Sequence, residues 1–546
     1  MNMLLALILF IISCGTWIAF WVCFAKWAED KSAKGYITLA LFLVSVALTI
    51  YWFLTWLPWF QPLFFHIFYT NAGFWFVSLI ILGGAVIIGL LVAFLAEEKE
   101  TGWKTGAILF CTCFVLWWIA YGIMGGAWTE KKLYESLTYE EIATLPDTTA
   151  VRYLPMEVAW RYGENRLQEP RIKHVDADPI VTNDEVRWIL TRAPKGMWNE
   201  WLRNSDGFTV VDSKGDVSTI RQKMTFGEGM LGSDNILWKL RQQRYWSEVS
   251  EIYYVQGGNG EVVAVAPYIN YSLKFPITVP SLDGVFLVHS SGTIEDLTLE
   301  QAQQHPLLKD IRIFPEKLAK LYVQAYAYKN GIGNAFFTHQ DQIKIPSVSE
   351  TVGGNEMPFL LPTEAGQKWF VAANPWGAEG IYRIFFVDAI TGKIEFFSLP
   401  RDSALIGPKR AQGYITRAYP TFDWNQIMVL ESRPIMREGI LYWMFTLTPN
   451  NLAGIVDTVM VNSRTNEVLS LGSDFQKTLR FLRGEKVGTL VGIGETPVSS
   501  VGQVTSPTSA VQQTADLSSE SIDQLIEELK KTINQLEELK GSLSKK

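Results

Sequence analysis

One glycine-rich segment has the spacing of a nucleotide-binding turn. Gly227, Gly229 and Gly232 match G-x-G-x-x-G, after strand-like residues 218–226 and before a helix predicted over Ser233–Trp246. In a dinucleotide-binding unit, bare glycines and a helix N-terminus hold a pyrophosphate. The helix is followed here by a predicted hairpin, however, and a βαβ unit would need a parallel strand. The alternative to a cofactor site is therefore a simple strand-to-helix turn.

A second candidate is a metal site on one predicted strand. His174, Asp176 and Asp178 alternate, so their side chains would share one face of that strand. A zinc-type site needs at least one more ligand, and no further histidine lies nearby in the sequence. The alternative is a solvated strand face before Pro179. We expect neither a metal nor a cofactor.

Other chemistries are limited by what the sequence lacks. It contains no G-x-S-x-G, H-E-x-x-H or P-loop motif. Its net charge is −7 and it has no basic stripe, so nucleic acid is not an expected partner. All the cysteines lie in apolar segments before residue 128, which excludes disulfides, cysteine-bound zinc and a cysteine nucleophile from the rest of the chain. Their positions are Cys14, Cys23, Cys111 and Cys113.

Two polar-aromatic loops have the composition of a recognition surface. Trp376 lies in an Asn-Pro-Trp-Gly turn, and Tyr414, Tyr419 and Trp424 lie in the segment 414–424. Exposed aromatic side chains beside glycine and proline are suited to peptide or glycan contact. Packing into the core is the competing interpretation.

The secondary-structure elements predicted along the chain begin with a membrane anchor. Four apolar runs without a charged residue precede residue 128, and each has about the 20 residues that a helix needs to cross a bilayer. Pumps and transporters keep ionisable residues at membrane depth, so these runs predict an anchor rather than an ion pathway. The runs are Met3–Ala25, Ile37–Leu57, Phe74–Leu95 and Gly106–Ala127.

Lysines predict the orientation of this anchor by the positive-inside rule. The connections after the first and third runs contain lysines, whereas the N-terminus and residues 58–73 contain none. We therefore expect both the N-terminus and the large domain to be extracytoplasmic, although Lys131 and Lys132 argue the other way. The lysines in the two inner connections are Lys26, Lys31, Lys34, Lys99 and Lys104.

Two further features lie near the expected membrane surface. The aromatic stretch Phe60–Tyr69 predicts a short amphipathic segment that lies in the membrane–water interface. The alternative is a more specific function, a binding site for a quinone or a lipid. Gly122 and Gly126 are four residues apart in the last run, a spacing that favours close helix–helix approach.

Beyond the anchor, a strand–turn–strand pattern recurs four times. Each copy has a β-rich strand, a polar turn with glycine or asparagine, and a second strand, which is hairpin chemistry. We expect a helical neck at 129–170 and tandem α+β modules with antiparallel sheets at 171–490. The copies are Val211–Val217, Val288–Ile294, Val387–Ile394 and Val461–Val468.

The third copy, whose residues 387–395 read VDAITGKIE, resembles the closing hairpin of PepSY-type and cystatin-like modules. The resemblance implies a helix packed on a small antiparallel sheet. It also implies a role in regulating peptidases or cell-wall enzymes outside the membrane. It carries no functional residues over to this chain.

The end of the sequence predicts a linker and a coiled coil. Residues 491–519 are rich in Ser, Thr, Gln and Pro, so they predict a flexible linker. Residues 520–546 predict an amphipathic coiled-coil helix that would make the chain a homo-oligomer, with docking elsewhere as the alternative. Its seam residues are Ile522, Ile526, Leu529, Ile533, Leu536 and Leu543.

Together these observations predict a multi-pass cell-membrane protein with a non-catalytic extracytoplasmic domain. That domain would bind or organise an envelope protein, peptide or glycan, and the anchor would contact the lipid bilayer. The alternative is a membrane-tethered hydrolase or peptidase that uses carboxylate or histidine chemistry.

Overall fold

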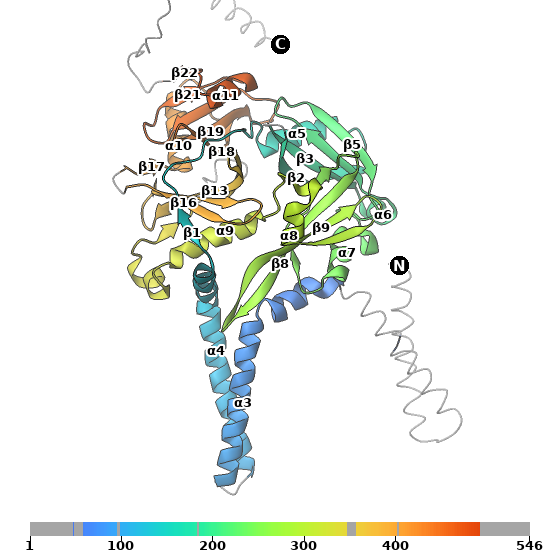
Figure 1. Ribbon diagram of the computed structural model, residues 1–546, viewed down its shortest axis with the longest axis vertical. Coiled ribbons are helices and arrows are strands. Elements are labelled where there is room, and N and C mark those ends of the chain that lie inside the picture. Colours follow the sequence, from blue (N-terminus) through green and yellow to red (C-terminus); the bar gives the residue numbers. More distant parts are fainter. Residues whose placement is uncertain are drawn as a thin grey trace, which may run out of the picture. The chain divides into compact units, whose positions relative to one another are not determined.

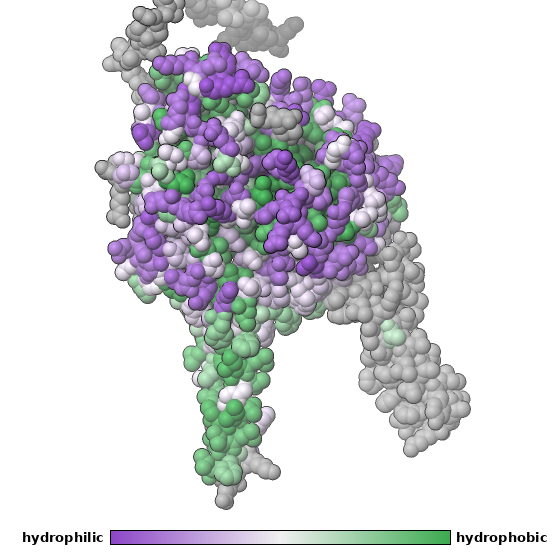
Figure 2. All heavy atoms as spheres, viewed as in Figure 1, coloured by the Kyte–Doolittle hydropathy of each residue, from purple (hydrophilic) through white to green (hydrophobic). Residues whose placement is uncertain are grey.

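A long helical hairpin leads into a globular part made of several sheets (Figure 1). The computed structural model describes residues 47, 58–95, 99–182, 185–346, 356–400 and 403–491. The hairpin consists of α3 (Ala72–Leu95) and α4 (Lys99–Ser136). Both helices are long and apolar enough to cross a membrane, and hydrophobic atoms cover them almost completely in Figure 2. The chain therefore has two possible membrane spans, which indicates membrane association.

The expected fold class is wrong in two respects. The described residues contain two candidate membrane helices, not four, and the runs Met3–Ala25 and Ile37–Leu57 lie outside the described residues. The described residues also include no C-terminal coiled coil, and the seam expected within 520–546 lies outside them. Apolar periodicity marks a surface that needs covering, but the sequence does not identify what covers it.

The second candidate membrane helix, α4, is longer than a bilayer core requires and continues into the globular part. At 1.5 Å per residue its 38 residues span about 57 Å, nearly twice the thickness of a bilayer core. Leu133 near its end is buried in a hydrophobic core, and the ring of Tyr134 stacks on Tyr139. The short strand β1 (Tyr139–Glu141) then pairs with a sheet strand. The hairpin is thus continuous with the core.

Glycines bring the two helices close together, but at different positions from those expected. A Cβ placed on Gly106 would lie 3.0 Å from the Ala85 carbonyl oxygen, and one on Gly89 would lie 2.9 Å from the Gly102 carbonyl oxygen. A Cβ on Gly122 or Gly126 would meet no atom of the described residues within 4 Å. The latter pair therefore leaves open space beside α4.

The expected neck at 129–170 is helical at two places, the end of α4 up to Ser136 and α5 (Met156–Arg166), with an extended segment between them. After α4 the chain forms β1 and runs extended as far as Pro155, where α5 begins. Upstream of the hairpin, residues 58–64 are helical and are followed by the π-helix η1 (Phe65–Tyr69).

The globular part contains four helix-plus-sheet units, each with a helix followed by an antiparallel sheet. Unit one comprises α5, β2 (Ile172–Thr182), β3 (Glu185–Pro194), α6 (Met197–Leu202), β4 (Asp206–Val211) and β5 (Val217–Lys223), and unit two comprises α7 (Ile236–Gln243), β6 (Glu248–Val249), β7 (Tyr253–Gln256), β8 (Val262–Lys274), β9 (Ile277–His289) and β10 (Ile294–Thr298).

The other two units follow the same order. Strand β1 adds to the edge of unit three by pairing parallel to β16. Unit three comprises α9 (Glu316–Ala325), β11 (Ile343–Lys344), β12 (Phe359–Thr363), β13 (Gly366–Pro375), β15 (Arg383–Asp388) and β16 (Ile394–Ser398), and unit four comprises α10 (Pro408–Ala418), β18 (Ile427–Arg437), β19 (Ile440–Pro449), β20 (Asp457–Asn462), β21 (Val468–Ser470), α11 (Phe475–Leu482) and β22 (Thr489–Leu490).

Short elements connect these units. A two-stranded pair links units three and four, and brief helices flank α9. The two paired strands are β14 (Gly380–Ile381) and β17 (Leu405–Ile406). The short helices are η2 (Gly232–Asp234), α8 (Leu299–Gln304), η3 (Pro306–Leu308), η4 (Tyr326–Tyr328) and η5 (Asn334–Thr338).

Each recurrent hairpin of the sequence joins two neighbouring strands of a different unit. In three of them an Asp or Asn side chain accepts hydrogen bonds from backbone N–H groups within the turn, namely Asp212, Asp388 and Asn462. His289 occupies this position in unit two, where its ring instead contacts Glu295 at 3.0 Å. Local side-chain-to-backbone bonds thus fix the turns.

The four sheets follow one another in a closed cycle of contacts. In unit one, Leu190 faces a core shared with unit four, while its neighbour Ile189 faces a core shared with unit two. Trp443 of unit four packs edge-on against Phe370 of unit three. Units three and two meet in a further core that includes Ile277 and α9. Because both faces of these sheets are covered, their central strands are nearly continuous apolar runs.

Candidate functional site: the ionic seam between the sheets

The glycine motif forms a closed turn. Gly227 N–H donates to the Asp234 carbonyl and Ile236 N–H donates back to Gly227, which closes the loop on itself. Helix α7 begins at Ile236, and the Asn235 side chain caps it by accepting a hydrogen bond from Trp238 N–H. These groups are therefore not free to bind a phosphate.

The glycines serve packing in this turn. A Cβ on Gly229 would lie 2.6 Å from the Ala193 Cβ, and both Gly229 and Gly232 have a positive φ that favours glycine. The turn therefore lies tightly against the unit-one sheet. Between its glycines it presents Glu228.

A β-bulge separates the three residues proposed as metal ligands. His174 pairs with Arg192, but Ala177 pairs with Leu190, so one extra residue interrupts the alternation of β2. His174 and Asp178 consequently point to opposite faces of the sheet, and Asp176 is exposed at the bulge. Within the described residues no group of His, Cys, Asp or Glu side chains is arranged to hold a metal ion.

His174 has a structural environment of its own. Its Nε2 lies 3.2 Å from the Thr209 hydroxyl, and its ring packs edge-on against Trp160. Burial, reinforced by the nearby Arg192, lowers the pKa of His174 to about 4. The imidazole is therefore neutral near pH 7.

Asp178 instead belongs to a buried cluster around Arg312, which we did not anticipate from the sequence. Arg312 Nη2 lies 2.6 Å from Asp178 Oδ1, and its Nη1 lies 3.7 Å from Glu251 Oε2. The guanidinium also lies over the rings of Tyr253 and Trp369, at 4.7 and 5.5 Å from their centroids. Those rings belong to units two and three, so Arg312 joins three units at one point.

Carboxylates outnumber cations in this cluster, and their protonation reflects that imbalance. Burial raises the pKa of Asp178 to about 7, and burial together with Asp176 and Asp178 raises that of Glu228 to about 8. Burial and the neighbouring Glu251 raise the pKa of Glu316 to about 7. Several of these acids therefore retain protons at pH values where an exposed carboxyl is ionised.

A second ionic cluster continues the first toward unit four. Glu431 has a fully buried side chain, and its Oε2 lies 3.3 Å from Arg152 Nη2 and 3.7 Å from Arg433 Nε. Arg152 lies over the rings of Trp188 and Phe359, from units one and three, at 5.3 Å from each centroid. Glu316 interacts electrostatically with both Arg152 and Arg312, so the two clusters are coupled.

We call this set the ionic seam. It contains three arginines and six carboxylates, and several of their buried atoms lack a hydrogen-bond partner, including Asp178 Oδ2, Glu228 Oε2 and Arg312 Nε. Its members are Arg152, Glu157, Asp178, Glu228, Glu251, Arg312, Glu316, Glu431 and Arg433.

Chemically, the ionic seam can hold protons and fasten the units together. A cavity beside Arg152 and Arg433 measures about 10 Å³, which is room for one water at most. Acids with pKa values near 7 are suited to general acid–base catalysis, but a substrate would need space beside them.

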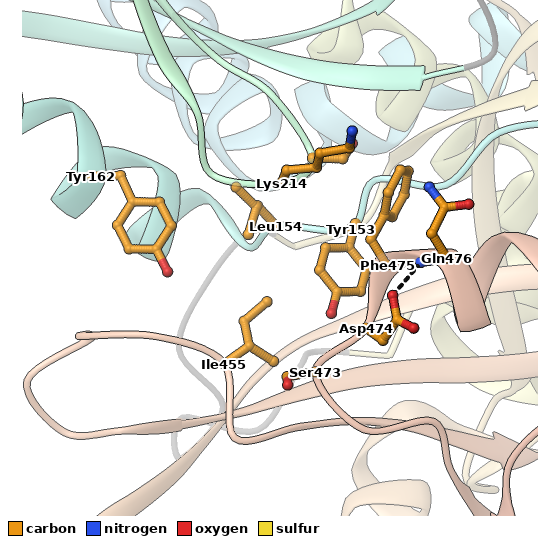
Figure 3. Close-up of a pocket in the computed structure, with 10 residues that line it drawn as sticks. Tyr153, Leu154, Tyr162, Lys214, Ile455, Ser473, Asp474, Phe475 and Gln476 are labelled. Atoms are coloured by element: carbon orange, nitrogen blue, oxygen red, sulfur yellow. Dashed lines mark hydrogen bonds between the residues drawn. The ribbon is translucent and has the colours of Figure 1, made fainter.

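A larger cavity lies between units one and four and is drawn in Figure 3. It measures about 290 Å³, and Tyr153, Tyr162 and Lys214 contribute to its walls. Its carboxylate, Asp474, accepts a hydrogen bond at 2.9 Å from Gln476 N–H and so caps α11. That contact gives the acid a structural role in this cavity.

The aromatic residues proposed for recognition lie in different environments. Trp376 is 48% exposed and stacks on His339 with ring centroids 4.4 Å apart. Tyr419 is buried, and its hydroxyl donates to Asp457 Oδ2 at 2.6 Å. Tyr414 and Trp424 pack against the same core as Tyr419. The structure does not bring Trp376 together with the other three.

Comparisons with known proteins identify no relative of this chain. No protein-family model, no curated protein and no solved structure matches it.

The sequence gives only a weak signal for the ionic seam. Arg312 stands between Ile311 and Ile313 and just before Phe314, an apolar setting that is unusual for an unpaired cation. Its acidic partners lie far away in the sequence, at Asp178 and Glu251. Only the fold shows that they meet.

Proposed function

We propose that this chain is a membrane-anchored, non-catalytic binding or scaffold protein whose four helix-plus-sheet units are tandem modules that hold an envelope partner. The observation that carries the proposal is the location of the acid–base groups. The acids with strongly raised pKa values lie in the ionic seam beside buried arginines, and Asp474, the one carboxylate among the lining residues of the cavity of about 290 Å³, caps a helix. Units that are fastened to one another in this way are suited to presenting a surface.

Two exposed apolar sites support partner binding. On α6, Met197, Trp198 and Leu202 are 63, 71 and 79% exposed. The second site is Trp376, which is 48% exposed and stacks on His339, two residues after the exposed Phe337. Large exposed aromatic side chains are the residue types that dominate protein interfaces. By analogy with PepSY-type modules, the partner we propose is a peptidase or a cell-wall enzyme.

Photo-crosslinking in intact cells tests this binding role. With benzoylphenylalanine in place of Trp376 or Trp198, we expect a discrete crosslinked product at one position or both. Gly413 is the matched control, because it is exposed and a Cβ there meets nothing within 4 Å. Equal, diffuse crosslinking at all three positions would contradict the proposal.

We further propose that the globular part is extracytoplasmic, on the basis of the lysine distribution. In a background without the native cysteines, Gly258→Cys places a thiol in an open, exposed turn before β8. Lys104→Cys places one near the opposite end of the helical hairpin. A membrane-impermeant maleimide should label the first variant in intact cells and the second only after permeabilisation. The reverse pattern would exclude an envelope partner.

A membrane-tethered hydrolase is the second candidate, and the raised pKa values of Asp178 and Glu228 favour it. If the purified chain hydrolyses peptide or glycan substrates, Asp178→Asn and Glu228→Gln should each abolish that activity. Activity that survives both substitutions would exclude the ionic seam as its site.

A further inference from the structure

A cavity of about 880 Å³ lies where the helical hairpin meets the globular part. We call it the juxtamembrane pocket. Its walls come from α4, from residues 58–71 before α3, and from unit two. The volume falls within the range of small-molecule and cofactor sites.

The exposed apolar surface of the helical hairpin ends at the level of the juxtamembrane pocket. On α3, apolar side chains are exposed from Trp75 onward, and on α4 they are exposed as far as Ile123. Phe275, in the turn between β8 and β9, packs edge-on against Phe76 of α3. Figure 2 shows the change from hydrophobic helices to the hydrophilic globular surface at this level. An amphiphile in the bilayer could therefore place its headgroup in the pocket.

The charged groups of the pocket form no ion pair with each other. Arg241 Nη1 lies 3.4 Å from the Pro58 carbonyl oxygen, the nearby Tyr245 interacts with the guanidinium electrostatically, and no described carboxylate lies within 4.0 Å of it. Burial lowers the pKa of this guanidinium, as expected for a partly desolvated cation. Glu248 accepts a hydrogen bond at 2.8 Å from the Tyr271 hydroxyl, which leaves its other carboxylate oxygen available.

Several other polar groups of the pocket are already held by hydrogen bonds within the protein. Gln61 Nε2 donates to the carbonyl oxygens of Tyr245 and Ser247 at 2.8 and 2.9 Å. The Tyr121 hydroxyl donates to Asn71 Oδ1 at 3.0 Å. These bonds hold the walls in place, and Arg241 and Glu248 are the arginine and the carboxylate left for a ligand, beside the ring of His66 in the same lining.

We propose that the juxtamembrane pocket binds the headgroup of a zwitterionic glycerophospholipid, with the phosphate diester on Arg241 and the ammonium group on Glu248. A guanidinium forms charge-assisted hydrogen bonds to a phosphate, and a carboxylate does so to an ammonium group. The open space beside Gly122 and Gly126 of α4 leaves room for the glycerol and the first acyl carbons. This proposal is independent of the partner suggested above.

Lipid binding to the full-length chain in detergent, measured by native mass spectrometry, tests the charge assignment. The probes are palmitoyl-oleoyl phosphatidylethanolamine, phosphatidylglycerol and phosphatidylcholine at equal concentration, and we expect the first to bind most tightly. Arg241→Gln should weaken its binding by about tenfold, the loss of one charge-assisted hydrogen bond. Glu248→Gln should remove the preference over phosphatidylglycerol. Arg410→Gln, which removes an exposed arginine of unit four, should change neither.

A second pair of variants tests whether the lipid occupies the open space beside α4. Gly126→Leu should block lipid binding, whereas Gly83→Leu, at an exposed position on α3 with nothing near its Cβ, should leave it unchanged. Soluble glycerophosphoethanolamine distinguishes a membrane lipid from a free phosphate ester, and we expect it to compete poorly.

Three outcomes would overturn the proposal: equal binding of all three lipids, unchanged binding in Arg241→Gln, or full competition by the soluble ester. If Gly126→Leu fails to fold, the charge variants still decide the question.

Discussion

The ionic seam and the juxtamembrane pocket both hold charged side chains away from bulk water, but they leave different charges unsatisfied. In the ionic seam, carboxylates outnumber arginines, and the pKa values of Asp178 and Glu228 rise to about 7 and 8. In the pocket, Arg241 has no described carboxylate within ion-pair distance. Charges in the ionic seam compensate each other or take up protons, whereas those in the pocket need a partner from outside. The difference separates groups that stabilise the fold from groups available to a ligand.

Removing the cation of the ionic seam should have the largest effect. Arg312→Met keeps much of the side-chain volume but leaves Asp178 and Glu251 without their arginine, which should destabilise the chain by about 3–5 kcal/mol. The midpoint of urea unfolding in detergent, followed by tryptophan fluorescence, measures this. Arg410→Met removes an exposed ion pair with Glu379 and should cost about 0.5 kcal/mol. Similar losses in the two variants would mean that the ionic seam does not fasten the units.

Neutralising the acid with the highest pKa should give a smaller, pH-dependent effect. The pKa of Glu228 is raised from 4.5 to about 8, so the folded state binds this proton more tightly than the unfolded state. Stability should therefore fall as the pH rises from about 4.5 to about 8. Glu228→Gln stays neutral and should exceed the wild type by about 2 kcal/mol above that range, with little difference below it.

The measurement for Glu228 is a pair of unfolding curves at acidic and alkaline pH. Glu364→Gln, on the exposed turn between β12 and β13, is the matched control and should show no pH-dependent gain. A constant difference between Glu228→Gln and the wild type at all pH values would show that desolvation of this carboxyl does not govern stability.

Substituting one glycine in each region should show how tightly that region is packed, and the smallest effect of all is expected in the pocket. Gly229→Ala forces a Cβ within 2.6 Å of Ala193 at a residue with a φ of 68°, which should cost about 1–3 kcal/mol. Gly126→Leu enters open space and should change stability by about 0.5 kcal/mol or less. Thermal unfolding of the two variants measures the contrast, and an equal cost would mean that the pocket is not open.

Local features of the fold were predictable from the sequence. The runs Phe74–Leu95 and Gly106–Ala127 lie within α3 and α4, because their composition alone determines that they avoid water. The recurrent turns, such as the one after Asp388, lie between neighbouring strands, since the side chain bonds to the backbone beside it.

Interactions between distant residues could not be predicted in the same way. The alternation of His174, Asp176 and Asp178 suggested a shared face, but the bulge in β2 moved Asp178 to the opposite side of the sheet. The glycine motif suggested a phosphate site, but contact with Ala193 made Gly229 a packing residue.

The sequence by itself therefore determined which segments avoid water, where the chain turns, and which residue types were available for chemistry. These properties depend on neighbours within a few positions along the chain. Only the tertiary structure decided which charges meet, because Arg312 and Asp178 are 134 residues apart and are joined by the packing of three sheets. It also decided that Arg241 would lie in a cavity beside α4. The physical reason is that desolvation and ion pairing depend on distance in space, which the order of residues does not specify.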